Sequence, residues 1–366
     1  MRFRGSTDRA VPPGKACHRR VGAVFLLGSC LVGNAMRAEP EDAGGPCAGA
    51  EVAARSATEA LDRGEWTRAG ELLRPLKAAG STCPAVALGL ARLRAKDGDT
   101  AEAERLFEQA TTLAPDDPVA HAQFARYWLS RGQPARADYE VSRALALDPG
   151  CPEGLVVEAE ILNLKDRPRE AFETLGTAAR LGPENAEAQY QLGVWLFRAN
   201  RHAEAVGQFE KAAALRPADA RTLDYLALGY EALGEGERAD ETFERALQVN
   251  DRGPSFDPFL DYNYGRFLLK VKRLDESAAY LDRAAALLPH SRGVHYERGK
   301  LNLARGDYER AREEAEHALS LRDESGTVLD LQVYYLLATV CARLGETELA
   351  KKYADLARTT PIPNQD

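Results

Sequence analysis

The sequence predicts an all-α protein built from repeated pairs of helices. The first observation is a period of 34 residues, which begins at Ala50 and continues almost to the C-terminus. The second is that Ala or Gly recurs at fixed places in the period, as expected where helix axes cross closely. The third is the composition: aromatic residues make up only 7% of the chain and there are only 2 Met, so Ala and Leu must supply most of the core.

Each period predicts a helix–turn–helix unit. The nine units begin at Ala50, Pro84, Pro118, Pro152, Ala186, Ala220, Pro258, Arg292 and Leu331. Counted from these residues, position 8 is always Ala or Gly, and positions 20 and 27 are Ala in all units but one. Position 15 is Gly in six units and Asp166, Asn200 or Lys272 in the others. Since Gly, Asn and Asp accept the left-handed backbone that ends a helix, we expect helices at about positions 1–14 and 16–30.

Two further positions complete the pattern. Position 32 is Pro in five units, which stops the second helix, and position 24 is a bulky residue in several units, such as Phe107, Phe209 or Phe243. Together with the small residues, this pattern resembles the tetratricopeptide repeat (TPR) family. The resemblance covers residues 50–364 and implies a right-handed α-solenoid of about nine TPR units. Position 4 departs from the family, which often has Trp there, because no unit of this chain does.

The repeat register is interrupted twice. Four extra residues precede the seventh unit, within 250–257, and five more precede the ninth, around 322–328. The first interruption divides the array into units 1–6 (50–253) and units 7–9 (258–364). Two interpretations stay open for it: a longer loop or second helix, or a bend that separates the two groups of units.

The N-terminal residues have a different character from the array. Residues 1–38 carry a net charge of +6, so subtraction from the chain's −8 leaves −14 for residues 39–366. Behind Arg20 comes an apolar run of 15 residues, 21–35, which is shorter than the roughly 20 residues of a membrane span. A basic stretch, a short apolar stretch and small residues are typical of a secretory signal. We therefore predict an export leader at 1–38, cleaved near Ala35 or Ala38 or kept as an anchor, and a linker at 39–49.

A cysteine within this leader offers a second interpretation. Leu27, Gly28, Ser29 and Cys30 resemble a bacterial lipobox, in which Cys30 would be acylated and become the first residue of the mature protein. The apolar residues directly after Cys30 are unusual for such a site. Lipidation of Cys30 and cleavage further along are therefore alternatives.

The sequence contains no motif typical of a catalytic, cofactor-binding or metal-binding site. The sequence contains no HExxH, CxxC, GxSxG, Walker-type or GxGxxG motif, so we expect no catalytic residue, no cofactor and no metal site. His121 and His295 both occupy position 4, which packs between helices, and are interpreted as core residues. An acidic array also disfavours nucleic acid as a partner, because binding to phosphates needs a basic surface.

Cys47 and Cys83 flank the first helix–turn–helix unit. Because the two helices of a unit are antiparallel, both cysteines should lie at the same end of it. Because an exported chain enters an oxidising compartment, where cysteine thiols form disulfides, we predict a disulfide between them.

By resemblance, positions 2, 5, 9, 12 and 13 line the concave face, where TPR proteins contact an extended peptide. Over the nine units these positions hold nine basic and seven acidic residues, and units 7–9 hold four of the bases and none of the acids. Aromatic and Arg side chains are favoured interface anchors. The predicted partner-binding residues are Tyr190, Arg198, Phe259, Tyr262, Arg266, Lys270, Tyr296, Lys300, Tyr335 and Arg343.

These features predict a non-catalytic scaffold, exported to the periplasm or the outer membrane of a bacterium. Its partner would be a protein or peptide with acidic or aromatic residues. One alternative is a membrane-tethered lipoprotein subunit of an outer-membrane, pilus or secretion assembly. Another is an accessory protein of polysaccharide export that contacts a glycan with its tyrosines.

Overall fold

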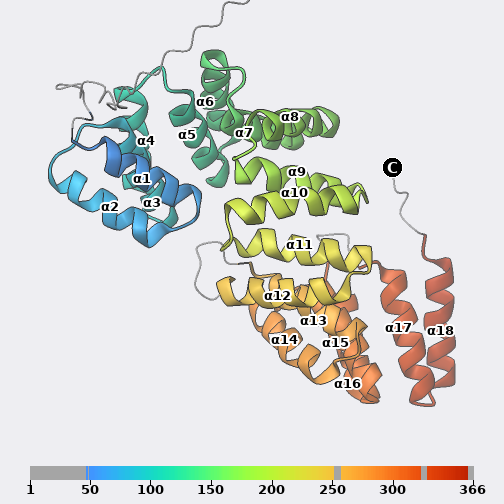
Figure 1. Cartoon of the computed structure of the whole chain (residues 1–366). Coiled ribbons are helices and arrows are strands. Elements are labelled where there is room, and N and C mark those ends of the chain that lie inside the picture. The colour runs from blue at the N-terminus through green and yellow to red at the C-terminus, as the bar shows by residue number, and fades with distance from the viewer. Residues whose placement is uncertain (1–46, 48, 251–256, 323–327, 362–366) are drawn as a thin grey trace, which may run out of the picture. The chain divides into compact units, whose positions relative to one another are not determined.

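The computed structural model describes residues 47, 49–250, 257–322 and 328–361 (Figure 1). The leader at 1–38, Cys30 and most of the 39–49 linker lie outside the described residues. Within them the chain forms eighteen α-helices and no strand. The helices are α1 (Glu51–Asp62), α2 (Trp66–Ala78), α3 (Pro84–Lys96), α4 (Thr100–Leu113), α5 (Pro118–Ser130), α6 (Pro134–Leu147), α7 (Pro152–Leu164), α8 (Pro168–Leu181), α9 (Ala186–Arg198), α10 (His202–Leu215), α11 (Ala220–Leu233), α12 (Gly236–Asn250), α13 (Leu260–Lys270), α14 (Leu274–Leu287), α15 (Arg292–Arg305), α16 (Tyr308–Ser320), α17 (Asp330–Arg343) and α18 (Thr347–Thr359).

The helices form consecutive antiparallel pairs, each of which is one predicted unit. α1 and α2 are the first pair and α17 and α18 the ninth, and the helices of each pair pack along their length. The first helices of adjacent units, such as α5 and α7, also contact each other. The predicted fold class, an all-α solenoid of about nine helix–turn–helix units, is confirmed.

Position 15 of every unit has a left-handed backbone. All nine residues there have φ between 57° and 82°. Six are Gly, and Asp166 and Asn200 tolerate this conformation because their short polar side chains can bond locally. Lys272, with φ of 65°, has no such compensation. The turn between the helices is therefore strained in the seventh unit.

Replacing Lys272 with Gly should relieve this strain. We expect Lys272→Gly to raise the free energy of unfolding by about 1 kcal/mol, because a side chain in the left-handed region costs roughly that much. Urea unfolding followed by circular dichroism measures the change. Arg131→Gly is the control, since Arg131 ends α5 with φ of −88° and Gly there should only add flexibility. Equal effects of the two substitutions would contradict the prediction.

The small residues lie where the helices cross. The Ala residues at positions 20 and 27 are fully or almost fully buried in every unit except the last, where Ala350 is partly exposed. Ser277 replaces Ala at position 20 of the seventh unit, and its hydroxyl donates to the Gly265 carbonyl at 2.8 Å. The one polar substitution in this set is thus satisfied.

Polar residues at position 4 tie successive units together. His121 is buried, and its ring nitrogens lie 2.6 Å from Glu140 Oε2 and 3.1 Å from the Pro115 carbonyl oxygen. His295 repeats this arrangement in the eighth unit, at 2.7 Å from Glu314 Oε2 and 3.0 Å from the Pro289 carbonyl oxygen. The interpretation of both His residues as core residues is confirmed. Each ring thus contacts the carbonyl of the Pro that follows the second helix of the preceding unit.

The junction between units 6 and 7 has a continuous apolar core. Phe243 of α12 lies 5.2 Å from Tyr264 and 5.5 Å from Phe267 of α13, measured between ring centroids. Residues 251–256 of the insertion lie outside the described residues. Its two ends are joined, because Asn250 Oδ1 accepts from the Asp257 amide at 2.7 Å and Asn250 Nδ2 donates to the Asp257 carbonyl at 3.1 Å.

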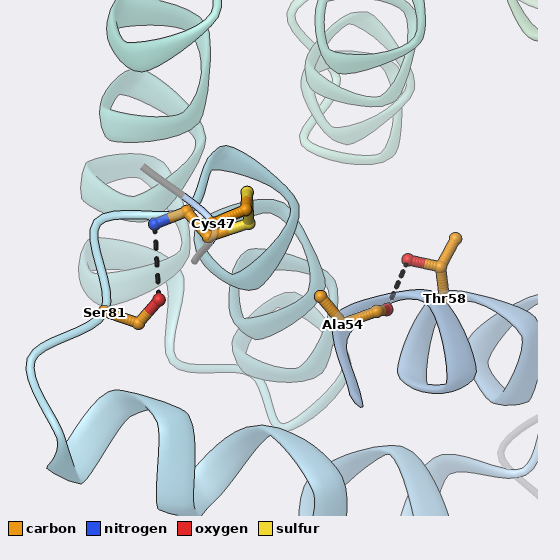
Figure 2. The surroundings of a disulfide bond; sticks show 5 residues. Cys47, Ala54, Thr58 and Ser81 are labelled. Atoms are coloured by element: carbon orange, nitrogen blue, oxygen red, sulfur yellow. Dashed lines mark hydrogen bonds between the residues drawn. A yellow bond between two sulfur atoms is a disulfide. The ribbon is translucent and has the colours of Figure 1, made fainter. Parts of the chain in front are cut away.

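Cys47 and Cys83 form a disulfide in the structure, which is the pairing expected from the sequence (Figure 2). Their Cα atoms are 4.4 Å apart. Cys83 precedes α3, and its amide donates to Ser81 Oγ at 3.3 Å. The bond therefore joins the start of α1 to the start of α3. The other two described cysteines, Cys151 and Cys341, are free and buried.

Candidate functional site

We call the following predicted partner-binding residues the tyrosine face: Phe259, Tyr262, Arg266, Lys270, Tyr296, Lys300 and Tyr335. Phe259 and Tyr335 are each 51% exposed. Tyr296 is partly buried against the core of the last two units, and burial raises the pKa of its hydroxyl. The Tyr262 hydroxyl lies beside Gly293, where a Cβ atom would be 3.0 Å away. The face thus presents two open aromatic rings, with the other tyrosines seated between helices.

The basic residues of the tyrosine face have acidic partners. Glu231 Oε2 accepts from Arg266 at 2.9 Å, and its other oxygen accepts from Lys270 at 3.0 Å. Glu297 pairs with Lys300 at 2.8 Å. Neither acid occupies an inner position of units 7–9. Glu231 belongs to unit 6, and Glu297 occupies position 6 of unit 8, which is not one of the inner positions. The face therefore carries much less free positive charge than the count implied.

The other predicted partner-binding residues lie apart or exposed. Tyr190 packs between Phe209 and Tyr225 at centroid distances of 6.3 and 5.8 Å, so it is largely a core residue. Arg198 ends α9 and Arg343 ends α17, and both are exposed. Within the described part of the chain, neither makes an ion pair at 4.0 Å or less.

A cavity of about 730 Å³ lies on the inner side of units 1–6. It is lined from α1, α3 and α5 on one side and from the ends of α9, α10 and α11 on another. Its walls combine the aromatic side chains of Trp66, Phe107 and Tyr127 with five arginines that come from different units. Arg63 pairs with Glu65 of its own unit, and the other four are Arg92, Arg126, Arg216 and Arg221. We call it the arginine cavity.

One buried carboxylate links three of these arginines. The Glu187 side chain is 13% exposed and lies 3.4 Å from Arg216, 3.6 Å from Arg221 and 3.9 Å from Arg126. Burial acts to raise the pKa of Glu187, but Arg126, Arg221 and Arg216 outweigh it, so the pKa is lowered. Glu187 therefore stays ionised and holds together side chains from units 3, 5 and 6.

The fourth arginine pairs with the first unit. Arg92 Nη2 lies 2.9 Å from Asp62 Oδ1 at the end of α1. Arg216 Nε donates to the main-chain oxygen of the same Asp62. Burial lowers the pKa of Arg92 and Asp62 opposes this, while Arg216 and Arg126 add like-charge repulsion. Residues 154 positions apart in the sequence thus meet across the cavity.

Part of this cavity is visible in the sequence. Arg92 and Arg126 share position 9 of successive units, as Arg266 and Lys300 do, and were counted among the inner bases. Arg216 follows the second helix of its unit, so no inner-face position predicts it. The contact between Arg216 of unit 5 and Asp62 of unit 1 depends on the curvature of the solenoid, which the repeat pattern does not predict.

A second group of buried charges lies at the junction of units 6 and 7. Asp224 of α11 is 2% exposed; its Oδ2 accepts from Asn263 Nδ2 at 2.7 Å and its Oδ1 has no hydrogen-bond partner. Burial, and next the charge of Asp257, raise the pKa of Asp224 well above its ordinary value. Asp257 is buried too, and its pKa is also raised. Both carboxyl groups therefore keep their protons to a higher pH than an exposed Asp does.

This pair predicts a pH-dependent junction. A raised pKa in the folded state means that its stabilising effect is complete below about pH 4, the ordinary carboxyl range, and is lost as pH rises through the folded-state pKa. We expect Asp224→Asn to raise the melting temperature at pH 7.5 and to change it little at pH 4. Thermal melts of both proteins across this range measure the effect. A destabilised Asp224→Asn protein at pH 7.5 would contradict it.

Two further kinds of site are absent from the described residues. No group of three or more His, Cys, Asp or Glu side chains among them is arranged to hold a metal ion. None of the helices in the described part has the length and apolar character needed to cross a bilayer.

Comparison with known proteins identifies the repeat. Two sequence profiles described as tetratricopeptide repeat match residues 60–122, 94–161, 165–220, 226–292 and 296–363, which together cover most of the chain. The chain belongs to the tetratricopeptide repeat family. Members of this family are protein–protein interaction scaffolds, and the pairs α1–α2 to α17–α18 are its repeats.

Individual relatives share the repeat at low identity. A CTR9 homolog of Arabidopsis thaliana is 27% identical over 179 residues, which are 47% of this chain and 16% of that protein. The type IV pilus assembly protein PilF of Pseudomonas aeruginosa is 26% identical over 138 residues, which are 37% of this chain and 55% of PilF. The chain thus spans about half or less of the length of these relatives.

Solved structures show the same fold. The Cut9 complex with Hcn1 matches 79% of this chain and 55% of that chain at 16% identity, with a TM-score of 0.67. The PilF structure matches 61% of this chain and 97% of its own at 21% identity, with a TM-score of 0.51.

Proposed function

We propose that this protein is a non-catalytic scaffold of a bacterial cell envelope, which binds an extended segment of a partner protein on the inner side of its repeats. The arginine cavity carries this proposal. Its volume of about 730 Å³ falls in the range of ligand-binding clefts and leaves room for several peptide residues. Aromatic and Arg side chains, which line it, are the residues that most often anchor protein interfaces.

Three observations support a location in the envelope. Residues 1–38 have the layout of an export signal. The Cys47–Cys83 disulfide suits a compartment where thiols are oxidised. PilF, a pilus assembly protein, is among the relatives. The lipobox-like residues before Cys30 favour a membrane-tethered lipoprotein subunit of such an assembly as the second candidate function.

The tyrosine face is proposed as a second contact for the same partner. It follows the arginine cavity along the first helices of the array, and its open rings, Phe259 and Tyr335, offer apolar area. Lys270 is also exposed, although it pairs with Glu231. A partner segment with acidic or aromatic residues would suit this face. The acidic residues of the partner would compete with Glu231 and Glu297 for the basic side chains of the face.

Site-specific photo-crosslinking tests the proposed function. A crosslinking amino acid would replace Gln123, which lines the arginine cavity, or Tyr335 of the tyrosine face. Tyr139, exposed on α6, is the control position on a second helix. We expect Gln123 and Tyr335 to crosslink one and the same protein in cells, and Tyr139 not to do so. Crosslinks only from Tyr139, or none at all, would overturn the proposal.

A double variant tests the tyrosine face separately. If it is a contact, Arg266→Ala with Tyr296→Ala should weaken binding of the crosslinked partner by about 1–3 kcal/mol for each anchor lost and leave the helix content unchanged. Rising salt should slow association. Binding that matches the unmodified protein in affinity and salt dependence would exclude the face from the interface.

A further inference from the structure

Four acids pair with Arg92, Arg126, Arg216 and Arg221, and they differ in how firmly they are held. Asp219, Glu187 and Glu160 have side chains that are 5%, 13% and 31% exposed. Asp62 is 54% exposed, although its partner Arg92 is only 14% exposed. Asp62 is therefore the counter-ion that solvent, or an incoming ligand, reaches most easily.

The exposed Asp62 side chain can leave Arg92 without disturbing the packing of the first unit. Asp62 is the last residue of α1, at the end of that helix opposite Cys47. The disulfide to Cys83 holds the start of α1 on α3. At the far end, Arg92 and Arg216 contact Asp62. The buried residues Ala60 and Leu61 hold this end of α1 in the core, so only the Asp62 side chain needs to turn away when its contact with Arg92 is released.

Arg92 requires an anion at this place. A guanidinium that is mostly buried is costly when it loses its counter-ion, and Arg126 and Arg216 nearby add to that cost. A basic or purely apolar segment that displaced Asp62 would leave this charge uncompensated. A carboxylate from the ligand would restore the same pair, because one anion replaces another.

We propose that Asp62 is an internal stand-in for an acidic side chain of the partner. The arginine cavity binds an acidic polypeptide segment, one carboxylate of which takes the place of the Asp62 side chain on Arg92, beside Arg216. This inference rests on the proposed function. It adds that the ligand is acidic and that Asp62 competes with it for Arg92. Since Asp62 occupies the position in the free protein, removing its charge makes the site more available.

The test uses a fluorescein-labelled peptide, Gly-Glu-Ala-Glu-Ala-Glu-Gly, and its counterpart with Lys in place of Glu. Fluorescence anisotropy with the purified, disulfide-bonded protein gives the Kd. We expect the Glu peptide to bind and the Lys peptide not to bind. Asp62→Asn should tighten binding of the Glu peptide about tenfold, whereas Arg92→Gln should weaken it at least about tenfold.

A matched control pair lies at the C-terminal end of α3, the helix that carries Arg92. Asp97, 55% exposed, pairs with Arg94 at 3.3 Å outside the cavity. Asp97→Asn and Arg94→Gln change the net charge as Asp62→Asn and Arg92→Gln do, and should leave the Kd within about twofold. If circular dichroism shows that Arg92→Gln does not fold, Arg216→Gln takes its place.

Opposite responses of the acid and base variants carry the inference. Tightening by Asp62→Asn with weakening by Arg92→Gln, and unchanged controls, supports it. It is overturned if the Glu peptide does not bind, if Asp62→Asn fails to tighten binding, or if Asp97→Asn tightens it equally, since that shows a general charge effect. The crosslinking from Gln123 does not depend on these peptides, so the proposed function can hold while this inference fails.

Discussion

Gly193→Leu should lower the free energy of unfolding by about 1–3 kcal/mol, because the new side chain has no space at the helix crossing. A Cβ atom at Gly193 would lie 2.5 Å from Cε1 and 2.7 Å from Cδ1 of Phe209. Phe209 is fully buried and packs against Tyr190 and Tyr225, so its ring cannot move aside freely. Gly265→Leu should behave alike, since its Cβ would lie 2.9 Å from Leu281 Cγ and 3.2 Å from the Leu281 main-chain nitrogen.

Two other helical glycines provide the control for this prediction. A Cβ at Gly207 in α10 or at Gly176 in α8 would meet no atom within 4 Å. Gly207→Ala and Gly176→Ala should therefore raise the free energy of unfolding by about 0.5–1 kcal/mol, because Ala restricts the unfolded chain. Urea unfolding of all four variants measures the contrast. Equal stability of Gly193→Leu and the unmodified protein would show that position 8 is not sterically limited.

Loss of the Cys47–Cys83 disulfide should lower the stability of the first unit by about 3–4 kcal/mol. The bond closes a segment of 36 residues, and this estimate follows from the entropy that such a closure removes from the unfolded chain. Repeats in a solenoid depend mainly on their neighbours, so the loss should be local. Hydrogen exchange of Cys47→Ala with Cys83→Ala should show faster exchange in α1 and α2 and little change in α13–α18.

Reduction of the native protein is the matched experiment. A thiol reductant should reproduce the exchange pattern of the double variant and have no further effect on that variant. The free cysteines Cys151 and Cys341 are buried, and burial raises the pKa of the Cys151 thiol to about 11, so neither should react at neutral pH. Unchanged exchange in α1 and α2 after reduction would mean that packing alone holds the first unit.

The candidate site could be predicted from the sequence only in part. The tyrosine face contains residues that inner-face positions correctly place on first helices, such as Tyr335. The free positive charge of this face could not be predicted from the inner positions, because Glu231 of the preceding unit pairs with Arg266 and Lys270. An ion pair between units depends on side-chain reach in three dimensions, and a count along one repeat leaves it out.

By itself, the sequence determined the repeat, its helix boundaries to within a few residues and its turns. These features are local: the left-handed backbone at Gly64 or Asn200 and the helix-stopping Pro115 act within one unit, and the small residues at position 8 act between adjacent helices. The tertiary structure alone decided where the arginine cavity lies. Arg216 meets Asp62 only because small rotations between successive units add up over the intervening repeats. The same accumulation over units sets which buried acid neutralises which base, and thereby which face of the scaffold remains open to a partner.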